Sequence, residues 1–76
     1  MPITVSIVED NEQLRGTLAR MIGRAEGFEC LGQYPSAEAG LVGIPAEKPN
    51  VVLMDINLPG MNGVECVRKL KEILPT

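Results

Sequence analysis

The fold of this 76-residue chain is decided by residues 51–63, which read VVLMDINLPGMNG. The run VVLM is uninterrupted by polar residues, a pattern that predicts a short buried strand. Proline and glycine follow within a few residues, so the strand is expected to end in a turn that leads into a helix. Asp55 therefore stands at the carboxyl end of a strand, where open α/β sheets place their binding crevices.

A second apolar segment also ends in acidic residues. Residues 3–8 read ITVSIV, which favours a central strand, and Glu9 and Asp10 follow it directly. If the two strands are parallel neighbours, these acids and Asp55 gather three negative charges in one small space. Such a cluster is unfavourable unless a cation compensates it, and carboxylate oxygens suit Mg²⁺. The sequence therefore indicates a cation site.

Residues 12–25 have the spacing of an amphipathic helix. Asn11 offers an N-cap, and Gly27 is suited to the position just after the helix. We expect the solvent side to carry Arg15, Arg20 and Arg24. The apolar residues that we expect to face the sheet are Leu14, Leu18, Met21, Ile22 and Ala25.

A second strand and a short helix are predicted next. The strand covers residues 28–34 and is weakened by Gly32, while Ser36 is a candidate cap for the helix. Pro45 and Pro49 are expected to bracket the loop that follows the helix. The side of the helix that we expect to be buried carries Ala37, Leu41 and Ile44.

The third strand, over residues 50–55, is followed by a last helix. Asn62 is its predicted cap, with Glu65 at the third helical position as in a capping box, and Pro75 marks its end. Its expected buried stripe consists of Val64, Val67, Leu70 and Leu74.

The resulting order βαβαβα predicts an α/β fold with a parallel sheet and right-handed crossovers. If the strand order is 2-1-3, the first helix covers one face and the other two helices cover the opposite face.

Composition narrows the possible functions. The net charge is −3, only 3% of the residues are aromatic, and the one basic cluster is Arg68, Lys69 and Lys71, so this segment is not expected to contact nucleic acid. No apolar run is long enough to cross a membrane, and no signal peptide is evident. Cys30 and Cys66 lack metal-site spacing, which favours reduced, structural thiols in a cytoplasmic protein.

These motifs together resemble the N-terminal part of a response-regulator receiver domain of two-component signalling. The resemblance rests on Glu9-Asp10-Asn11 after the first strand, on Asp55 after the third, and on LPGMNG at residues 58–63. It covers the whole chain and is closest to the subfamily with a C-terminal helix-turn-helix output domain. It implies a flavodoxin-like sheet that begins in the order 2-1-3.

The resemblance also implies a role for each site residue. Asp55 would accept a phosphoryl group from a histidine kinase or phosphotransfer protein, with Mg²⁺ or Mn²⁺ as cofactor. Asp10 would ligate the metal directly, Glu9 directly or through water, and the backbone carbonyl of Asn57 would add a ligand. Such a domain is not an enzyme beyond its own phosphorylation and dephosphorylation. It would control a DNA-binding output domain outside this segment.

By the same resemblance, we expect residues 1–76 to be a truncated receiver domain. Receivers continue through two more strands and helices, with a Ser or Thr ending the fourth strand and a Lys ending the fifth. Lys48, Lys69 and Lys71 do not stand at strand ends and are not substitutes. The third strand would then be an exposed edge, and Val64, Val67 and Leu70 would be partly bare in the absence of the next strand. The segment is expected to form a homodimer, either by antiparallel pairing of the two third strands or by exchange of elements.

Other interpretations stay open. One is a Mg²⁺-dependent phosphohydrolase with an aspartyl nucleophile, which usually carries a second acid two residues later, where Asn57 stands. Another is a receiver fragment that self-assembles without signalling activity. Each motif taken singly also has a structural explanation, because Glu9 and Asp10 favour a helix start and Asp55 suits a turn.

Overall fold

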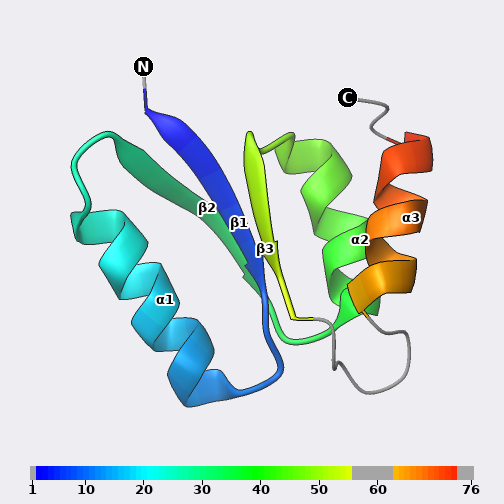
Figure 1. Ribbon diagram of the computed structural model, residues 1–76, viewed down its shortest axis with the longest axis horizontal. Coiled ribbons are helices and arrows are strands. Elements are labelled where there is room, and N and C mark those ends of the chain that lie inside the picture. The colour runs from blue at the N-terminus through cyan, green and yellow to red at the C-terminus, as the bar shows by residue number, and fades with distance from the viewer. Residues whose placement is uncertain (1, 56–62, 74–76) are drawn as a thin grey trace.

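The computed structural model describes residues 2–55 and 63–73, in which the expected alternation of strands and helices is present (Figure 1). The predicted cap Asn62, the apolar Leu74 and the terminating Pro75 lie outside the described residues. The elements are β1 (Ile3–Val8), α1 (Glu12–Arg24), β2 (Phe28–Tyr34), α2 (Ala37–Glu47), β3 (Val51–Met54) and α3 (Gly63–Ile73).

The three strands form one parallel sheet in the order β2-β1-β3, which confirms the predicted topology. Val8, the last residue of β1, lies between Tyr34 on β2 and Met54 on β3. Beyond the strands, the Glu9 N–H donates to the Tyr34 carbonyl and the Asp55 N–H donates to the Val8 carbonyl, each at 3.0 Å. The carboxyl ends of all three strands are therefore level.

The sheet separates two layers of helices. Helix α1 lies against one face, and α2 and α3 lie against the other (Figure 1). The main core forms between the sheet and α2 and α3. It consists of Val8, Ala37, Ile44, Cys66 and Leu70.

Asn50 fixes the start of β3 against β1. Its Oδ1 accepts from the Thr4 N–H at 2.9 Å and from the Thr4 hydroxyl at 3.0 Å. Its own N–H reaches Thr4 Oγ1 at 2.9 Å. These bonds set the register of β3, and therefore the position of Asp55 at its other end.

The β2 edge carries a bulge. Val5 pairs with Cys30 and Ser6 pairs with Gly32, so Leu31 is an extra residue without a partner in the β1 ladder. A bulge of this kind bends a strand and increases its local twist.

A polar network holds α2 to the sheet. The Glu47 carboxylate accepts from the Ser6 hydroxyl at 3.1 Å and from the Tyr34 hydroxyl at 2.6 Å. Burial and the neighbouring Glu47 raise the pKa of Tyr34 to about 12. Gly32 and Gly43 provide the space, because a Cβ atom at either position would collide with the Tyr34 hydroxyl.

The prediction that Pro45 begins the loop after α2 is wrong, because the helix continues to Glu47. Proline lacks an N–H and removes one helical hydrogen bond, but here it stands in the last turn, where that loss is least disruptive. The turn is held by the two bonds to Glu47 and by Lys48, a left-handed residue with φ 51° whose N–H donates to the Ile44 carbonyl.

The apolar stripe predicted for α3 is only partly buried, as expected for a segment that lacks the next strand. Leu70 is buried as expected, but Val64 is 60% exposed and Val67 is 38% exposed. Cys66 is fully buried in their place, and its thiol donates to the Ala37 carbonyl at 3.7 Å. Helix α3 therefore turns its Cys66 and Leu70 side towards α2.

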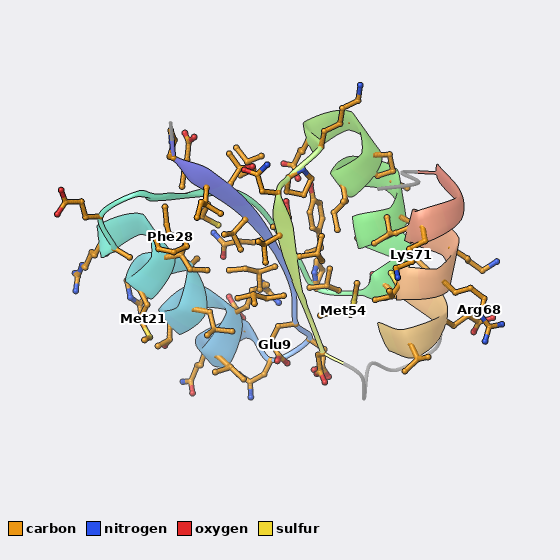
Figure 2. All side chains as sticks on the ribbon, turned by 45° about the horizontal axis from the view of Figure 1, so that its top comes forward. Glu9, Met21, Phe28, Met54, Arg68 and Lys71 are labelled. Carbon is orange, nitrogen blue, oxygen red and sulfur yellow. The ribbon has the colours of Figure 1, made fainter. Side chains whose placement is uncertain are left out.

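The buried stripe predicted for α1 is also wrong in part, because α1 contains no fully buried residue. Met21 is 63% exposed and points away from the sheet, as Arg68 does on α3 (Figure 2). The reason is geometric, since α1 packs mainly on β2 and β1 and has no second helix beside it among the described residues.

We predict that Gly43→Ala destabilises the protein by about 1–3 kcal/mol in chemical denaturation, because overpacking outweighs the helical preference of alanine. Gly23→Ala in α1 is the control. Its Cβ would meet no atom within 4 Å, so it should stabilise the protein by about 0.5–1 kcal/mol. Equal stabilisation by both substitutions would contradict the packing argument.

Candidate functional site

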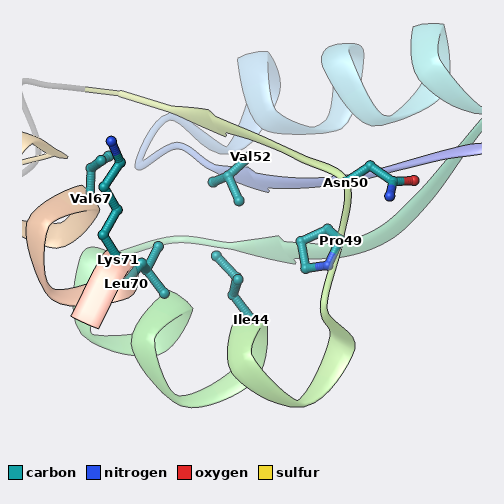
Figure 3. Close-up of a pocket in the computed structure, with 7 residues that line it drawn as sticks. All are labelled: Ile44, Pro49, Asn50, Val52, Val67, Leu70 and Lys71. Carbon is teal, nitrogen blue, oxygen red and sulfur yellow. The ribbon is translucent and has the colours of Figure 1, made fainter. Parts of the chain in front are cut away.

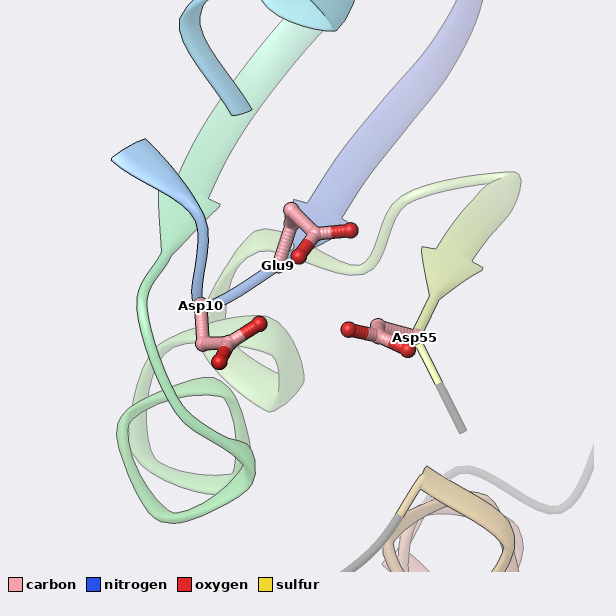
Figure 4. Close-up of side chains that lie close together, drawn as sticks. All are labelled: Glu9, Asp10 and Asp55. Carbon is pink, nitrogen blue, oxygen red and sulfur yellow. The ribbon is translucent and has the colours of Figure 1, made fainter. Parts of the chain in front are cut away.

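Three carboxylates meet at the carboxyl edge of the sheet (Figure 4). Glu9 and Asp10 follow β1, and Asp55 follows β3. One oxygen from each residue lies within 4.8 Å of the others, which is close enough for a single cation to contact all three. The structure thus brings together the three acidic side chains selected from the sequence. Asn57, the fourth residue selected, lies outside the described residues.

The turn between β1 and α1 holds two of these acids. The Asn11 N–H donates to the Glu9 carboxylate at 3.1 Å, and Asn11 Oδ1 caps α1 by accepting from the Leu14 N–H at 3.0 Å. The predicted N-cap is therefore present. It also couples the Glu9 carboxylate to the first turn of the helix.

Arg15 is a site neighbour that the sequence analysis missed, because it was expected on the solvent side of α1. Its side chain is half-buried, and Nη1 donates to the backbone carbonyl of Glu9 at 2.9 Å. Its contact could have been predicted from its position at the end of the first turn of α1, because a long side chain there can reach back over the start of the helix.

The clustered charges affect the ionisation of Glu9. The hydrogen bond from the Asn11 N–H lowers the pKa of Glu9, but partial burial and the carboxyl groups of Asp10 and Asp55 raise it by more. Its pKa therefore lies above the ordinary value of 4.5. Crowded carboxylates resist full ionisation, and a bound cation would relieve this resistance.

The donor set suits a hard divalent cation. The three side chains offer only carboxylate oxygens, which favour Mg²⁺, Ca²⁺ or Mn²⁺ over softer metals. The two half-buried acids and the exposed Asp10 leave one side of the cluster open to water, as Mg²⁺ requires when it keeps several water ligands.

A hollow of about 250 Å³ adjoins the acids on the α1 side of β3. Its walls are mainly apolar, so Glu9 and Asp55 have an apolar surface on one flank. The residues that line it are Ile7, Val8, Glu9, Leu18, Leu53, Met54 and Asp55.

A second hollow, of about 280 Å³, lies between α2, β3 and α3 (Figure 3). None of the described residues that line it is acidic, and the amide oxygen of Asn50 already accepts from Thr4. The lining residues are Ile44, Pro49, Asn50, Val52, Val67, Leu70 and Lys71. The acidic cluster is therefore the stronger candidate for a functional site.

Comparison with known proteins identifies similar sequences. The family model described as the response regulator receiver domain matches residues 5–76. The response regulator GacA of Pseudomonas protegens is 40% identical over 68 residues, covering 90% of this chain and 32% of that protein. A protein-glutamate methylesterase/protein-glutamine glutaminase of Paramagnetospirillum magneticum is 40% identical over 74 residues, covering 97% and 21% respectively. The chain thus spans a third or less of the length of these relatives.

Solved structures share the fold. The response regulator domain of Thermotoga maritima CheB superposes with a TM-score of 0.93 at 26% identity, covering 100% of this chain and 57% of that one. The CheX-CheY-BeF3-Mg complex of Borrelia burgdorferi gives a TM-score of 0.80 at 28% identity, with coverages of 95% and 55%.

The raised pKa of Glu9 predicts a pH-dependent effect of Glu9→Gln in cation-free buffer. A carboxyl group with a raised folded-state pKa contributes stability below pH 4.5, and this contribution is lost as pH rises through the folded-state pKa. Glu9→Gln should therefore become progressively more stabilising as the pH rises above 4.5, until Glu9 of the folded wild type is fully ionised. Urea unfolding across this range measures the effect.

Glu12→Gln is the matched control, since it removes an exposed charge from the first turn of α1. It should be neutral or slightly destabilising at neutral pH, because an acid at a helix start is favourable. A pH-independent effect of Glu9→Gln would contradict the crowding of charge at the site.

Proposed function

The chain belongs to the response regulator receiver domain family, and on this premise we propose that it is a phosphoacceptor in which Asp55 takes the phosphoryl group. The observation that carries the proposal is the meeting of Glu9, Asp10 and Asp55 at one edge of the sheet. In this proposal the donor is a phosphohistidine on a histidine kinase or phosphotransfer protein.

The proposed step transfers a phosphoryl group between two side chains. A carboxylate oxygen of Asp55 bonds to phosphorus while the phosphorus–nitrogen bond of the donor breaks. The electron pair of that bond stays with the donor imidazole, which then takes up a proton. The product on Asp55 is an acyl phosphate.

A carboxylate and a phosphoryl group repel each other, so the step needs positive charge. Bound Mg²⁺ or Mn²⁺ would neutralise the approaching oxygens and align them. We propose that Asp10 and Asp55 ligate the cation directly, that Glu9 does so directly or through water, and that the Asn57 backbone carbonyl adds a ligand. The magnesium-containing complex of a similar receiver structure supports this choice of metal.

The three acids are suited to different roles. The Glu9 carboxylate accepts a hydrogen bond from the Asn11 N–H, and the Glu9 N–H is bonded to the sheet. These restraints suit Glu9 to be a metal ligand with a fixed position. Asp10 is the most exposed of the three and is accessible to a hydrated cation. Asp55 closes β3, is half-buried and lies beside the other two acids and the apolar hollow, which suits it to accept the phosphoryl group.

The output of the whole protein is a separate proposal. We propose a response regulator that acts through a DNA-binding output domain and works in the cytoplasm. This rests on the sequence motifs and on the similarity to GacA. The second candidate is an enzymatic output, because the methylesterase relative is equally similar. No helix within residues 2–55 and 63–73 has the length and apolar character to cross a membrane.

We also propose that residues 1–76 form the first part of a receiver domain. The chain covers 57% of the Thermotoga maritima domain, so the relative has additional sequence in which the expected Ser or Thr and Lys would lie. In this role the segment is not an enzyme beyond its own phosphorylation and dephosphorylation. A phosphohydrolase is the less favoured alternative, because Asn57 stands where such enzymes carry a second acid.

For the complete response regulator, we predict that a small acyl phosphate labels the wild type in the presence of Mg²⁺ and does not label Asp55→Asn. Asp10→Asn should reduce labelling and its dependence on Mg²⁺, because a ligand charge is lost. Intact-mass spectrometry detects the added phosphoryl group. Glu29→Gln, an exposed change on β2, should label as the wild type does. Equal labelling of Asp55→Asn would refute the assignment of the phosphoacceptor.

For the 76-residue segment studied by itself, we predict a symmetric dimer formed by antiparallel pairing of β3 with its copy. Val51 and Leu53 are 41% and 39% exposed on this short apolar strand. Leu53→Lys should give a monomer, because charge on an edge strand opposes pairing. Val42→Lys, at an 82% exposed position on α2, should remain dimeric. Sedimentation of a folded wild-type monomer would exclude this dimer.

A further inference from the structure

Arg15, on α1, makes a hydrogen bond to the backbone of the acidic site. Its Nη1 donates to the Glu9 carbonyl at 2.9 Å, six residues back along the chain. Arg20, on the same helix, is exposed and donates to the Thr17 hydroxyl at 3.3 Å. Both residues are arginines of α1, but Arg15 donates to a backbone carbonyl of the acidic site and Arg20 donates to a hydroxyl of its own helix.

We propose that Arg15 is a positioning residue that orients Glu9 and Asp10 for cation binding. The proposal rests on the function proposed above for the acidic cluster. The contact is with the carbonyl of the peptide that joins the two acids. Holding that carbonyl fixes the peptide plane, and the peptide plane sets the directions in which both carboxylates leave the backbone.

The contact matters because Glu9 lies just beyond the sheet. Its N–H is held by the Tyr34 carbonyl at 3.0 Å, and its carboxylate is held by the Asn11 N–H at 3.1 Å. Its carbonyl lies beyond the end of β1 and accepts a hydrogen bond from Arg15. Of these three restraints, only the one from Arg15 is donated by a side chain, so a substitution can remove it without altering the backbone.

A positioning role and a purely electrostatic role for Arg15 predict opposite changes in cation affinity when Arg15 is replaced. If Arg15 acted only as a positive charge, it would repel a divalent cation, and removing the charge would tighten cation binding. If Arg15 positions the acids, removing it releases the peptide and weakens binding. Loss of a group that orients metal ligands typically costs on the order of tenfold or more in affinity.

The test is titration of the 76-residue chain with Mn²⁺, followed by water-proton relaxation, for the wild type, Arg15→Met, Arg15→Lys and Arg20→Met. The measurement is made well below the cation-free unfolding midpoint of each variant, so that all are folded. Arg15→Met should weaken Mn²⁺ binding on the order of tenfold. Arg15→Lys should recover part of the loss, because lysine keeps a donor. Arg20→Met should match the wild type.

The outcomes separate this inference from the proposed function. Binding by Arg15→Met that is unchanged or tighter overturns the positioning role and leaves the cation site standing. Equal weakening by Arg15→Met and Arg20→Met, or no recovery in Arg15→Lys, also overturns it. A wild type that binds no Mn²⁺ overturns the cation site and the role of Arg15 together.

Discussion

Two backbone hydrogen bonds at the carboxyl end of β1 fix the geometry on which the rest of the molecule depends. One joins the Glu9 N–H to the Tyr34 carbonyl, and the other joins the Asp55 N–H to the Val8 carbonyl. Buried backbone groups must be paired, so neither neighbouring strand can shift along β1 without losing its ladder. A slip by one residue would also turn the apolar side chains of the strand to the wrong face. The register that forms the core is thus the register that brings the acids together.

The site adds a local electrostatic cost that the rest of the fold must offset. Burial, and after it the carboxyl groups of Asp10 and Asp55, raise the pKa of Glu9, so the ionised form of Glu9 is disfavoured in the folded state. Two features offset this cost. They are the apolar packing around Val8 and Ile44 and the hydrogen bonds between Asn50 and Thr4 at the far end of β3. Hydrogen bonds at both ends of β3 allow the sheet to keep like charges near each other. Locally unfavourable interactions of this kind are expected at sites where a protein binds or reacts.

Local features of the sequence were sufficient to predict the elements, and tertiary contacts explain the errors. The caps Asn11 and Ser36 were recognised because they act within one helical turn. Helix α2 extends past Pro45 because Tyr34 and Ser6, distant in sequence, bind its last turn. The side of α3 that is buried depends on where α2 lies. The meeting of the acids was predictable from strand order, but the contact from Arg15 was not, since apolar periodicity places it on a polar face.

The bulge at Leu31 has a consequence for how this sheet behaves at high concentration. A three-stranded sheet has two edges, and here they differ, because β2 is bent by its extra residue whereas β3 pairs regularly with β1. A distorted edge is a poor template for another strand. In the 76-residue segment by itself, strand addition is therefore favoured at β3 over β2, which would limit edge-to-edge association to pairs of copies.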